Sequence, residues 1–372
     1  MFSLESELQE RLKTDAERWL NRELSVLPDS LVSFADNDYL GLARHPKVVQ
    51  AAIDDLQRGR IGGGAARLIS GNFTGHREFE ERLAAFKKCG AALVFPTGYA
   101  VPCGVIPALM TKADFVVLDK LCHASLLDGA KLSGARRVVF RHNDAEHLAE
   151  VLAEIRARDA KARILIVVES VYSMDGDLAP LTAICELKEK FGAWLMVDEA
   201  HGTGIFGANG EGLCAQLGVS SRVEIQMGTL GKALGVSGGY VACSATVKQY
   251  LVQHARSFIF TTATPPCLAA ALMASLEIVG GGEGVQLRKK LWSNIGLLHS
   301  LTAGRTNSAS PIVPVIVGDE QASLLASKKL RSAGFYVPAV RYPTVARGEA
   351  RLRITVSARH ERQQLEQLAK CL

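Results

Sequence analysis

Seven short apolar runs alternate with helix-like segments along most of this chain, and this alternation restricts the fold more than any other feature. The runs are AALVF (91–95), FVVLD (115–119), RVVF (137–140), ILIVVES (164–170), AWLMVDE (193–199), VEIQMGT (223–229) and GGYVACS (238–244). Helical segments between them include DAEHLAEVLAEIRARD and PLTAICELKEKFG, the second with proline in its first turn. Such a pattern is typical of a mostly parallel sheet covered by helices on both faces, so we predict an α/β fold with a large seven-stranded sheet.

The pattern changes toward each end of the chain. Roughly the first thirty residues predict one polar helix, and the turn-rich segment SFADNDYLGLARHP follows. Past Pro265, a long helical stretch leads to PIVPVIVGD, FYVPAV and ARLRITVSARH, which predict strands, and then to a last helix. We therefore predict an N-terminal helical arm at 1–37, a large domain at 38–270 and a small α+β domain at 271–372.

Charge and cysteine content exclude several classes of protein. The net charge of +5 is spread along the chain without a basic block, which argues against nucleic-acid binding but favours an anionic ligand. The eight cysteines form no C-x-x-C pair and predict reduced thiols in a cytoplasmic protein. The N-terminal residues lack the pattern of a signal peptide, and no apolar run reaches the roughly 18 residues of a membrane span. We expect no membrane partner.

Residues suited to a ligand site lie at or just past the carboxyl ends of five of the seven predicted strands. They are Gly98 and Tyr99, His123, Ser173 and Asp175, Asp198 and His201, and Thr229 and Lys232. Any one of these groups has an ordinary explanation, because strand ends lead into polar turns. Ligands of open α/β sheets bind at the carboxyl ends of the strands, so the five groups together predict a site with a carboxylate, imidazoles, hydroxyls and an amine.

Lys232 lies between small and apolar residues in GTLGKALGVSGGYVACS (228–244). The segment is not a phosphate-binding P-loop, because Gln226 replaces the first glycine and Ala233 replaces the final serine or threonine of that motif. Two interpretations remain. Lys232 is either an ordinary loop lysine or a nucleophile whose affinity for a proton is lowered by its surroundings, as in enzymes that form an imine with a carbonyl group.

Pyridoxal 5'-phosphate (PLP) requires this combination of groups: an amine for its aldehyde, a carboxylate for its pyridine nitrogen, a helix N-terminus and hydroxyls for its phosphate, and a flat side chain against its ring. The candidates are Lys232, Asp198, Gly98, Tyr99, Thr229 and His123. A metal site of His201, Asp198 and His123 is the alternative, but it lacks metal-ligand spacing and leaves Lys232 without a role. A dinucleotide-binding dehydrogenase would need G-x-G-x-x-G, which PTGYAVPCG does not contain.

Eight segments resemble those of the α-oxoamine synthases, which are fold-type I PLP enzymes. The segments are SFADNDYLGLARHP, RLISGNFTGHREFEERLAAF, FPTGYAV, DKLCHASLLDG, ESVYSMDGDLAPL, MVDEAHGTGIFG, GTLGKALGVSGGYVACS and HARSFIFTTATPP. They cover about Asn37 to Pro266, and PTVARGEARLRITVSARH adds a C-terminal match. The resemblance implies a PLP-binding large domain, a small C-terminal domain and a homodimer whose active sites lie at the subunit interface.

The resemblance also implies a role for individual cofactor-binding residues. Lys232 would hold the cofactor as an imine and transfer the proton, Asp198 would pair with the ring nitrogen, and His201 would bond the ring hydroxyl. His123 would stack on the ring. The remaining contacts would come from Ser173, Thr229, Gly98 and Tyr99, and from Thr261 or Thr262 toward the phosphate in the neighbouring subunit.

Substrate contacts are implied by the same resemblance. Arg353 would bind the carboxylate of the amino acid, with Arg351 and Arg347 as alternatives. Asn37 would lie near the substrate and Thr344 on its path. An arginine of the first helix would help to hold the substrate, and Arg18 is the candidate, with Arg11 and Arg22 as alternatives.

Within the family, RLISGN and HARSFIFTTATPP are most similar to the biotin-pathway branch. That branch condenses L-alanine with a pimeloyl thioester of coenzyme A or acyl carrier protein, with loss of carbon dioxide, to give 8-amino-7-oxononanoate. Glycine C-acetyltransferase, 5-aminolevulinate synthase and serine palmitoyltransferase share most of these motifs, so a sibling reaction is the alternative. A catalytically silent partner subunit is also an alternative, but it would be expected to lack Lys232.

Overall fold

The computed structural model describes residues 3–302, 306 and 308–372. The chain divides into two compact units. The larger unit consists of Asn37–Ser173 and Asp177–Lys290, and the smaller unit consists of Met1–Asp36, Met174–Gly176 and Leu291–Leu372. Each unit is described separately below.

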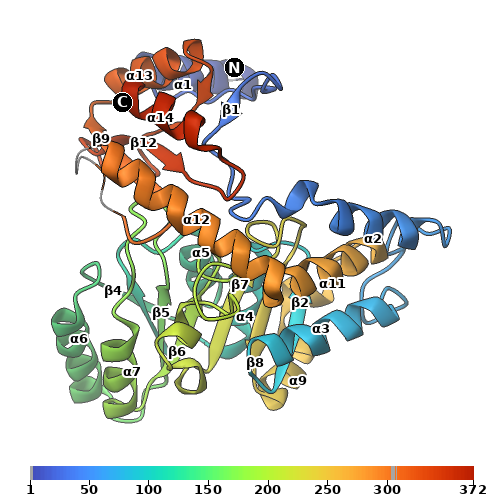
Figure 1. The fold of residues 1–372 in the computed structure, drawn as a ribbon. Helices are drawn as coiled ribbons and strands as arrows, with labels where there is room; N and C mark the ends of the chain where they lie inside the picture. The colour runs from blue at the N-terminus through green and yellow to red at the C-terminus, as the bar shows by residue number, and fades with distance from the viewer. Residues whose placement is uncertain (1–2, 303–305, 307) are drawn as a thin grey trace. The chain divides into compact units, whose positions relative to one another are not determined.

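A seven-stranded sheet organises the larger unit (Figure 1). Its strands are β2 (Ala91–Phe95), β3 (Phe115–Asp119), β4 (Arg136–Phe140), β5 (Ile164–Glu169), β6 (Trp194–Asp198), β7 (Ile225–Thr229) and β8 (Gly239–Cys243). They lie in the order β2-β8-β7-β6-β5-β3-β4, and only β8 runs antiparallel to its neighbours. Each strand coincides with one of the seven apolar runs, so the predicted fold class is confirmed.

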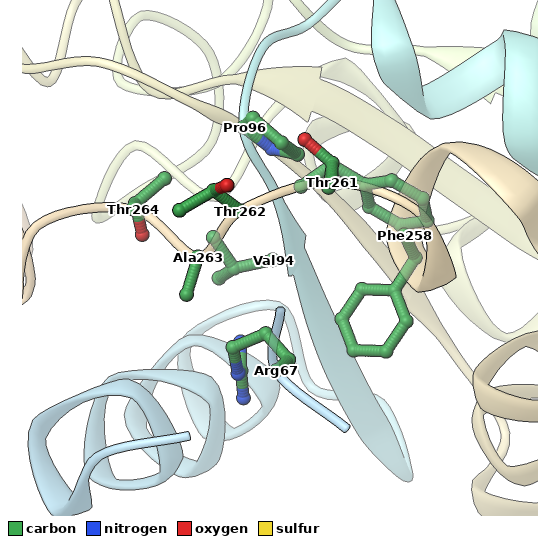
Figure 2. A pocket seen from close by; sticks show the side chains of 9 residues that line it. Arg67, Val94, Pro96, Phe258, Thr261, Thr262, Ala263 and Thr264 are labelled. Atoms are coloured by element: carbon green, nitrogen blue, oxygen red, sulfur yellow. The ribbon is translucent and has the colours of Figure 1, made fainter. Parts of the chain in front are cut away.

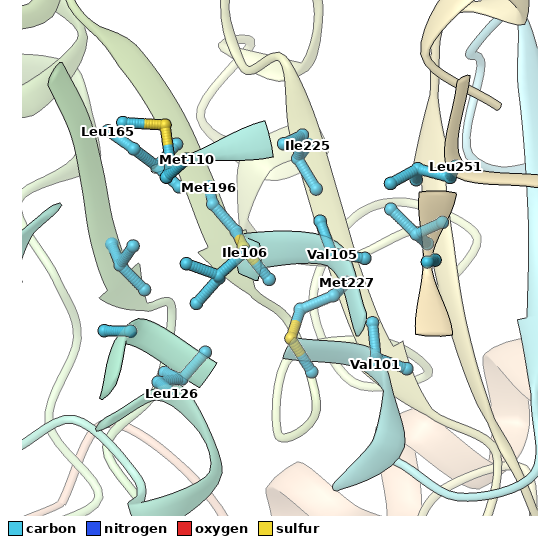
Figure 3. Packing of buried hydrophobic residues seen from close by; sticks show 14 of the residues in the cluster. Val101, Val105, Ile106, Met110, Leu126, Leu165, Met196, Ile225, Met227 and Leu251 are labelled. Atoms are coloured by element: carbon cyan, nitrogen blue, oxygen red, sulfur yellow. The ribbon is translucent and has the colours of Figure 1, made fainter. Parts of the chain in front are cut away.

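Alternate residues of the strands pack against different groups of helices, because successive side chains of a strand point to opposite faces. Leu93 and Phe95 of β2 belong to a cluster with the helices that follow β2 and β3, part of which Figure 3 shows. Ala92 and Val94 belong to a second cluster on the other face. Both faces are therefore buried, which explains why the strands have continuous apolar runs in place of an apolar–polar alternation.

The helices of the larger unit fall mainly between the strands. They are η1 (Leu42–Arg44), α2 (Pro46–Leu56), α3 (Thr74–Phe86), α4 (Ala100–Leu109), α5 (Ala124–Leu132), α6 (Ala145–Arg158), α7 (Leu181–Lys190), α8 (Leu213–Gln216), η2 (Ser220–Arg222), α9 (Ala245–His254), α10 (Arg256–Ile259) and α11 (Pro266–Gly280). Helices α6 and α7 confirm the two helices predicted at 144–159 and 180–192. The sheet has one hydrophobic core on each face. Helices α4, α5, α9 and α10 cover one face, and α3 and α11 cover the other.

The smaller unit combines both ends of the chain. Its elements are α1 (Leu4–Glu17), β1 (Val32–Ser33), β9 (Ile312–Gly318), α13 (Glu320–Ser332), β10 (Phe335–Tyr336), β11 (Ala339–Val340), β12 (Ala350–Thr355) and α14 (Arg362–Cys371). Strands β11, β12 and β9 form an antiparallel sheet in that order, and β1 pairs with β10. The boundary with the larger unit falls within α12 (Gly282–Leu301).

The division differs from the predicted domains at two places. The large unit extends to Lys290 and not to residue 270, because the apolar helix α11 packs against α2 and α3. The N-terminal arm belongs to the smaller unit, because β1 pairs with β10 and the backbone oxygen of Phe34 accepts a hydrogen bond from Thr355. The predicted thirty-residue helix is also too long, since α1 ends at Glu17 and Trp19 has a left-handed φ of 59°.

Helix length and the state of the cysteines are two further properties of the described residues. Among the described residues, no single helix is long and apolar enough to cross a membrane, and α11 and α12 meet that criterion only as a pair bent by 70°. All eight cysteines are free thiols, and five of them are buried, as expected for reduced thiols in a protein core.

Candidate functional site

Lys232 lies in the turn that connects β7 with β8. Hydrogen bonds from Leu230 N to the Gly238 oxygen (2.9 Å) and from Val236 N to the Leu230 oxygen (3.0 Å) close this turn. Gly235 has a left-handed φ of 69°, and a Cβ there would collide with the backbone of residues 42 and 43. The small residues around Lys232 therefore permit a tight turn that packs directly against another segment.

A chain of hydrogen bonds connects Lys232 with the start of the larger unit. The Nζ atom of Lys232 lies 2.7 Å from Nε2 of His201, and Nδ1 of His201 lies 2.5 Å from the Tyr39 hydroxyl. That hydroxyl donates to Oδ1 of Asn37 at 3.2 Å, so its oxygen accepts a hydrogen bond from the Nδ1–H of His201. The Nε2 atom of His201 is then the acceptor for the amine of Lys232. Asn37 and His201 therefore lie on one chain of hydrogen bonds with Lys232, and their roles toward substrate and cofactor stay predictions.

Two buried carboxyl groups lie at the ends of neighbouring strands. Asp198 ends β6 and is directly opposite Glu169, which ends β5. Burial raises the pKa of Asp198 to about 6, although the positive charge of Lys232 and a hydrogen bond from the Ala200 amide (2.8 Å) oppose this effect. Burial also raises the pKa of Glu169 well above its usual value, and the charge of Asp198 acts in the same direction.

His123 caps the N-terminus of α5. Its Nδ1 accepts a hydrogen bond from the Ser125 amide at 3.3 Å, and its own backbone amide donates to Oε1 of Glu169 at 2.5 Å. Burial lowers the pKa of His123, and the positive charge of Lys232 lowers it further. The imidazole is thus neutral at neutral pH, and a neutral ring suits stacking better than a cation beside the Lys232 ammonium.

A narrow cradle lies where β2 leads into α4. A Cβ added to Gly98 would lie 3.1 Å from Cβ and 3.2 Å from Oγ1 of Thr229, so a larger residue would press against that hydroxyl. Tyr99 occupies the N-cap position of α4, a helix of ten residues. A helix N-terminus next to a hydroxyl suits a phosphate group. The Tyr99 hydroxyl itself bonds to Asp128, which raises the pKa of Tyr99 to about 12, so the backbone of Tyr99 is the part suited to a phosphate.

These groups match what PLP requires: an amine on Lys232, a buried carboxyl on Asp198, a neutral imidazole on His123, and a cradle at Gly98 and Thr229. The model of the family of class I and II aminotransferases matches residues 29–372. The chain belongs to this family.

Members of the aminotransferase family with curated names and solved structures resemble the chain closely. The chain is 46% identical to the 8-amino-7-oxononanoate synthase of Geobacter sulfurreducens over 340 residues, which cover 90% of this chain and 86% of that protein. A serine palmitoyltransferase from S. paucimobilis with a bound PLP–myriocin aldimine has 28% identity and a TM-score of 0.92, with coverage of 100% and 97%. The 8-amino-7-oxononanoate synthase of Francisella tularensis has 26% identity and a TM-score of 0.78, with coverage of 92% and 97%.

Three other predicted cofactor contacts lie in two different places of this aminotransferase-family chain. Ser173 follows β5 in the loop at the same sheet edge as Asp198. Thr261 and Thr262 lie in the segment after α10 and line a pocket with Arg67 and Phe258 (Figure 2). Neither Lys232 nor Asp198 nor His201 lines that pocket. The contact of Thr261 or Thr262 with the phosphate in a neighbouring subunit therefore stays a prediction.

The predicted substrate residues Arg18, Thr344 and Arg353 belong to the smaller unit, and their roles stay predictions. Arg353 is buried in β12, and its Nη1 donates to Thr355 Oγ1 at 3.0 Å. Arg351 of the same strand forms ion pairs with Asp175 (2.5 Å) and Glu349 (3.2 Å). Arg351 therefore already binds two carboxylates of its own chain, and Arg353 remains the predicted contact of a substrate carboxylate.

The loop that carries Ser173 is held at its base by His142. The two ring nitrogens of His142 lie 2.8 Å from Asp119 and 2.8 Å from Asp177, and Val171 pairs with Leu178 across the loop. Burial would lower the pKa of His142, but the hydrogen bonds to the two carboxylates outweigh it and raise the pKa to about 10. The imidazolium therefore bridges two strand-end loops at neutral pH.

Replacing His142 with glutamine is expected to lower the Tm of the protein by about 2–8 °C near pH 7, because the charge between two carboxylates is lost. The stabilisation by His142 is full below its unfolded pKa of roughly 6.5 and is lost as the pH rises through about 10. The difference between wild type and variant should therefore shrink between pH 6.5 and 10. Thermal unfolding at three pH values measures it, with the exposed His254→Gln as control. A difference that does not change with pH would contradict the assigned charge.

Sequence reasoning missed two residues of the site, Tyr39 and Glu169. Tyr39 lies in NDYLG, where nothing local indicates that its hydroxyl contacts a histidine 162 residues away. Glu169 had a usable signal, because it is a carboxylate at the end of a continuous apolar strand, as Asp198 is.

Proposed function

We propose that the chain is a PLP-dependent acyltransferase that condenses L-alanine with a pimeloyl thioester, with loss of carbon dioxide, to give 8-amino-7-oxononanoate in biotin biosynthesis. The observation that carries the proposal is the contact of Lys232 with His201 beside the buried Asp198. The identity of 46% to a curated 8-amino-7-oxononanoate synthase selects the reaction. The likeness to serine palmitoyltransferase keeps a sibling condensation as the second candidate.

Each residue of the candidate site would contact a different part of the cofactor, according to its position. When bound, PLP supplies an aldehyde for an amine and a protonated ring that takes up the electron pair of the α-carbon. Asp198 would hold the proton on the ring nitrogen, and His201, oriented by Tyr39 and Asn37, would hold the ring hydroxyl. His123 would support the flat face of the ring, and Gly98 with Thr229 would hold the phosphate.

Lys232 would accept the α-proton of L-alanine at its Nζ atom. The contact of Nζ with Nε2 of His201 keeps the amine at the edge of the sheet where Asp198 and His123 also lie. Arg353 would bind the carboxylate of the amino acid through its planar guanidinium group, in keeping with its buried position and with the commitment of Arg351 to Asp175.

A homodimer is part of the proposal. The larger unit exposes the apolar side chains of Ile61, Ile69 and Phe260, which are 77%, 81% and 70% exposed. Two segments that carry them lie side by side, because Ala66 pairs with Thr262. Such an apolar surface is typical of a protein interface, and it lies next to the Thr261 and Thr262 that we expect to reach a neighbouring active site. We further propose a cytoplasmic enzyme, with coenzyme A or acyl carrier protein as the donor's carrier.

The visible absorption spectrum of protein reconstituted with PLP tests the proposal. We expect a band of the lysine-bound cofactor that shifts with L-alanine, and formation of 8-amino-7-oxononanoate, detected by mass spectrometry, when pimeloyl-coenzyme A is added. Glycine with acetyl-coenzyme A is the matched control pair. Turnover of that pair alone would move the function to the glycine acetyltransferase branch, and a protein that shows no cofactor band would refute both assignments.

A further inference from the structure

Glu169 connects two residues to which the proposed mechanism gives a role. It ends β5, is 2% exposed and lies directly opposite Asp198 of β6. Its Oε1 accepts the hydrogen bond of the His123 backbone amide at 2.5 Å, across to the loop that follows β3. One buried side chain is therefore placed beside the carboxyl that would face the cofactor ring and bound to the backbone of the residue that would stack on it.

We propose that Glu169 is a positioning residue, which fixes His123 through this hydrogen bond and does so as a neutral carboxyl group, so that Asp198 is the charged member of the pair. The inference rests on the proposed function, because the roles of His123 and Asp198 belong to it.

The geometry explains why one of the two carboxyl groups is neutral. Two carboxylates on adjacent strands in register repel each other, and burial removes the water that would screen them. Burial raises the pKa of Glu169 well above its usual value, while that of Asp198 rises only to about 6. Other groups that act on Glu169 are Lys232, which favours its charged form, and Asp119, which opposes it. Cys122 and Tyr172 also lie within electrostatic reach of Glu169, and burial raises the pKa of both well above the usual values, so they add no charge.

The hydrogen bond from the His123 amide to Glu169 fixes the backbone at the N-terminus of α5. The His123 amide belongs to the N-cap residue of the helix, where the chain turns and the imidazole takes its direction. Nδ1 of His123 contacts the Ser125 hydroxyl at 2.8 Å and accepts from the Ser125 amide, so the ring is held from one side by the helix. Without an acceptor at Glu169, the partly buried amide would lose its partner, and the cap would shift to find another.

Three variants of the holoenzyme distinguish a requirement for the hydrogen-bond acceptor of Glu169 from a requirement for a negative charge at that position. Glu169→Gln keeps the shape and an acceptor oxygen but has no charge, Glu169→Leu removes the acceptor, and Glu169→Asp keeps the carboxyl but withdraws it by one methylene group. The exposed Glu154→Gln on α6 is the control. The readouts are the dissociation constant of PLP, the visible circular dichroism of the bound cofactor, which reports the contacts on its ring, and the pH profile of kcat/KM.

We expect Glu169→Gln to stay within about 3-fold of wild type in PLP affinity, with an unchanged dichroism band and pH profile. Glu169→Leu and Glu169→Asp should weaken PLP binding by about 10-fold or more and change the band, because the partly buried His123 amide loses its acceptor. If Glu169→Leu does not fold, Glu169→Asp carries the same comparison.

Two results would overturn the inference. A Glu169→Gln variant as impaired as Glu169→Leu would mean that the charge is required, and wild-type dichroism and affinity in all three variants would mean that Glu169 does not position His123. Either result would leave the proposed function intact if wild type binds PLP and forms the product. A wild type without bound PLP would instead refute the proposed function itself.

Discussion

Lys232→Ala is expected to reduce kcat for the condensation of L-alanine with a pimeloyl thioester by at least about 10⁴-fold. The variant loses the amine that would hold the cofactor and also the base that would take the α-proton, and base catalysis alone is typically worth about 10²–10⁴. The Nζ atom of Lys232 lies 2.7 Å from Nε2 of His201, and an alanine side chain cannot reach that position. Steady-state kinetics with the exposed Lys131→Ala as control measure the effect.

A second readout separates chemistry from folding. Reduction of the wild type with borohydride should fix PLP covalently, and peptide mass spectrometry should locate it on Lys232. The alanine variant should bind PLP without covalent fixation and keep a Tm close to that of wild type. Wild-type turnover in this variant, or fixation on another lysine, would show that the assignment of Lys232 is wrong.

Asp198→Asn is expected to lower kcat/KM by about 10²–10⁴-fold and to weaken PLP binding. An amide has no negative charge to keep the ring nitrogen protonated, although it nearly preserves the shape and the contact with the Ala200 amide. Asp198→Glu serves as the matched control, because it keeps the negative charge. Activity of the asparagine variant within a few-fold of wild type would mean that another residue pairs with the ring.

The same residue predicts a pH dependence of cofactor binding. The pKa of Asp198 is about 6 in the cofactor-free protein, and only its ionised form pairs with the ring nitrogen. The PLP affinity of wild type should therefore fall as the pH falls through about 6. The affinity of Asp198→Asn should lack this transition, and equilibrium binding at pH 5 to 8 compares the two.

Local sequence was sufficient for the sheet, because a parallel strand buried on both faces needs a continuous apolar run, and each of the seven runs forms a strand. Because all of these strands except β8 run in one direction, their carboxyl ends lie at one edge of the sheet, which is why the position after a strand predicts His123, Asp198, His201 and Lys232 as candidate site residues. The ends of the chain were less predictable. Residues 18–31 mix charged residues with leucines, as an amphipathic helix does, but the chain turns at Trp19 and then continues toward β1.

The sequence did not predict the contacts between segments that are distant along the chain. Arg351 and Arg353 are two residues apart on one strand and have the same side chain, and only the fold shows that Arg351 is bound by Asp175. In the same way, Asn37 reaches the site through Tyr39, and a hydroxyl carries no local sign of its partner.

The amino-acid sequence by itself determined the α/β fold and the cofactor class, and it predicted the lysine, aspartate and two histidines of the candidate site, because periodicity and strand ends are local properties of a chain. Only the tertiary structure decided that Tyr39 orients His201 and that Glu169 lies between His123 and Asp198. The physical reason is that hydrogen bonds and pKa shifts depend on burial and on which groups meet across a sheet, and neither quantity is set by neighbours in the sequence.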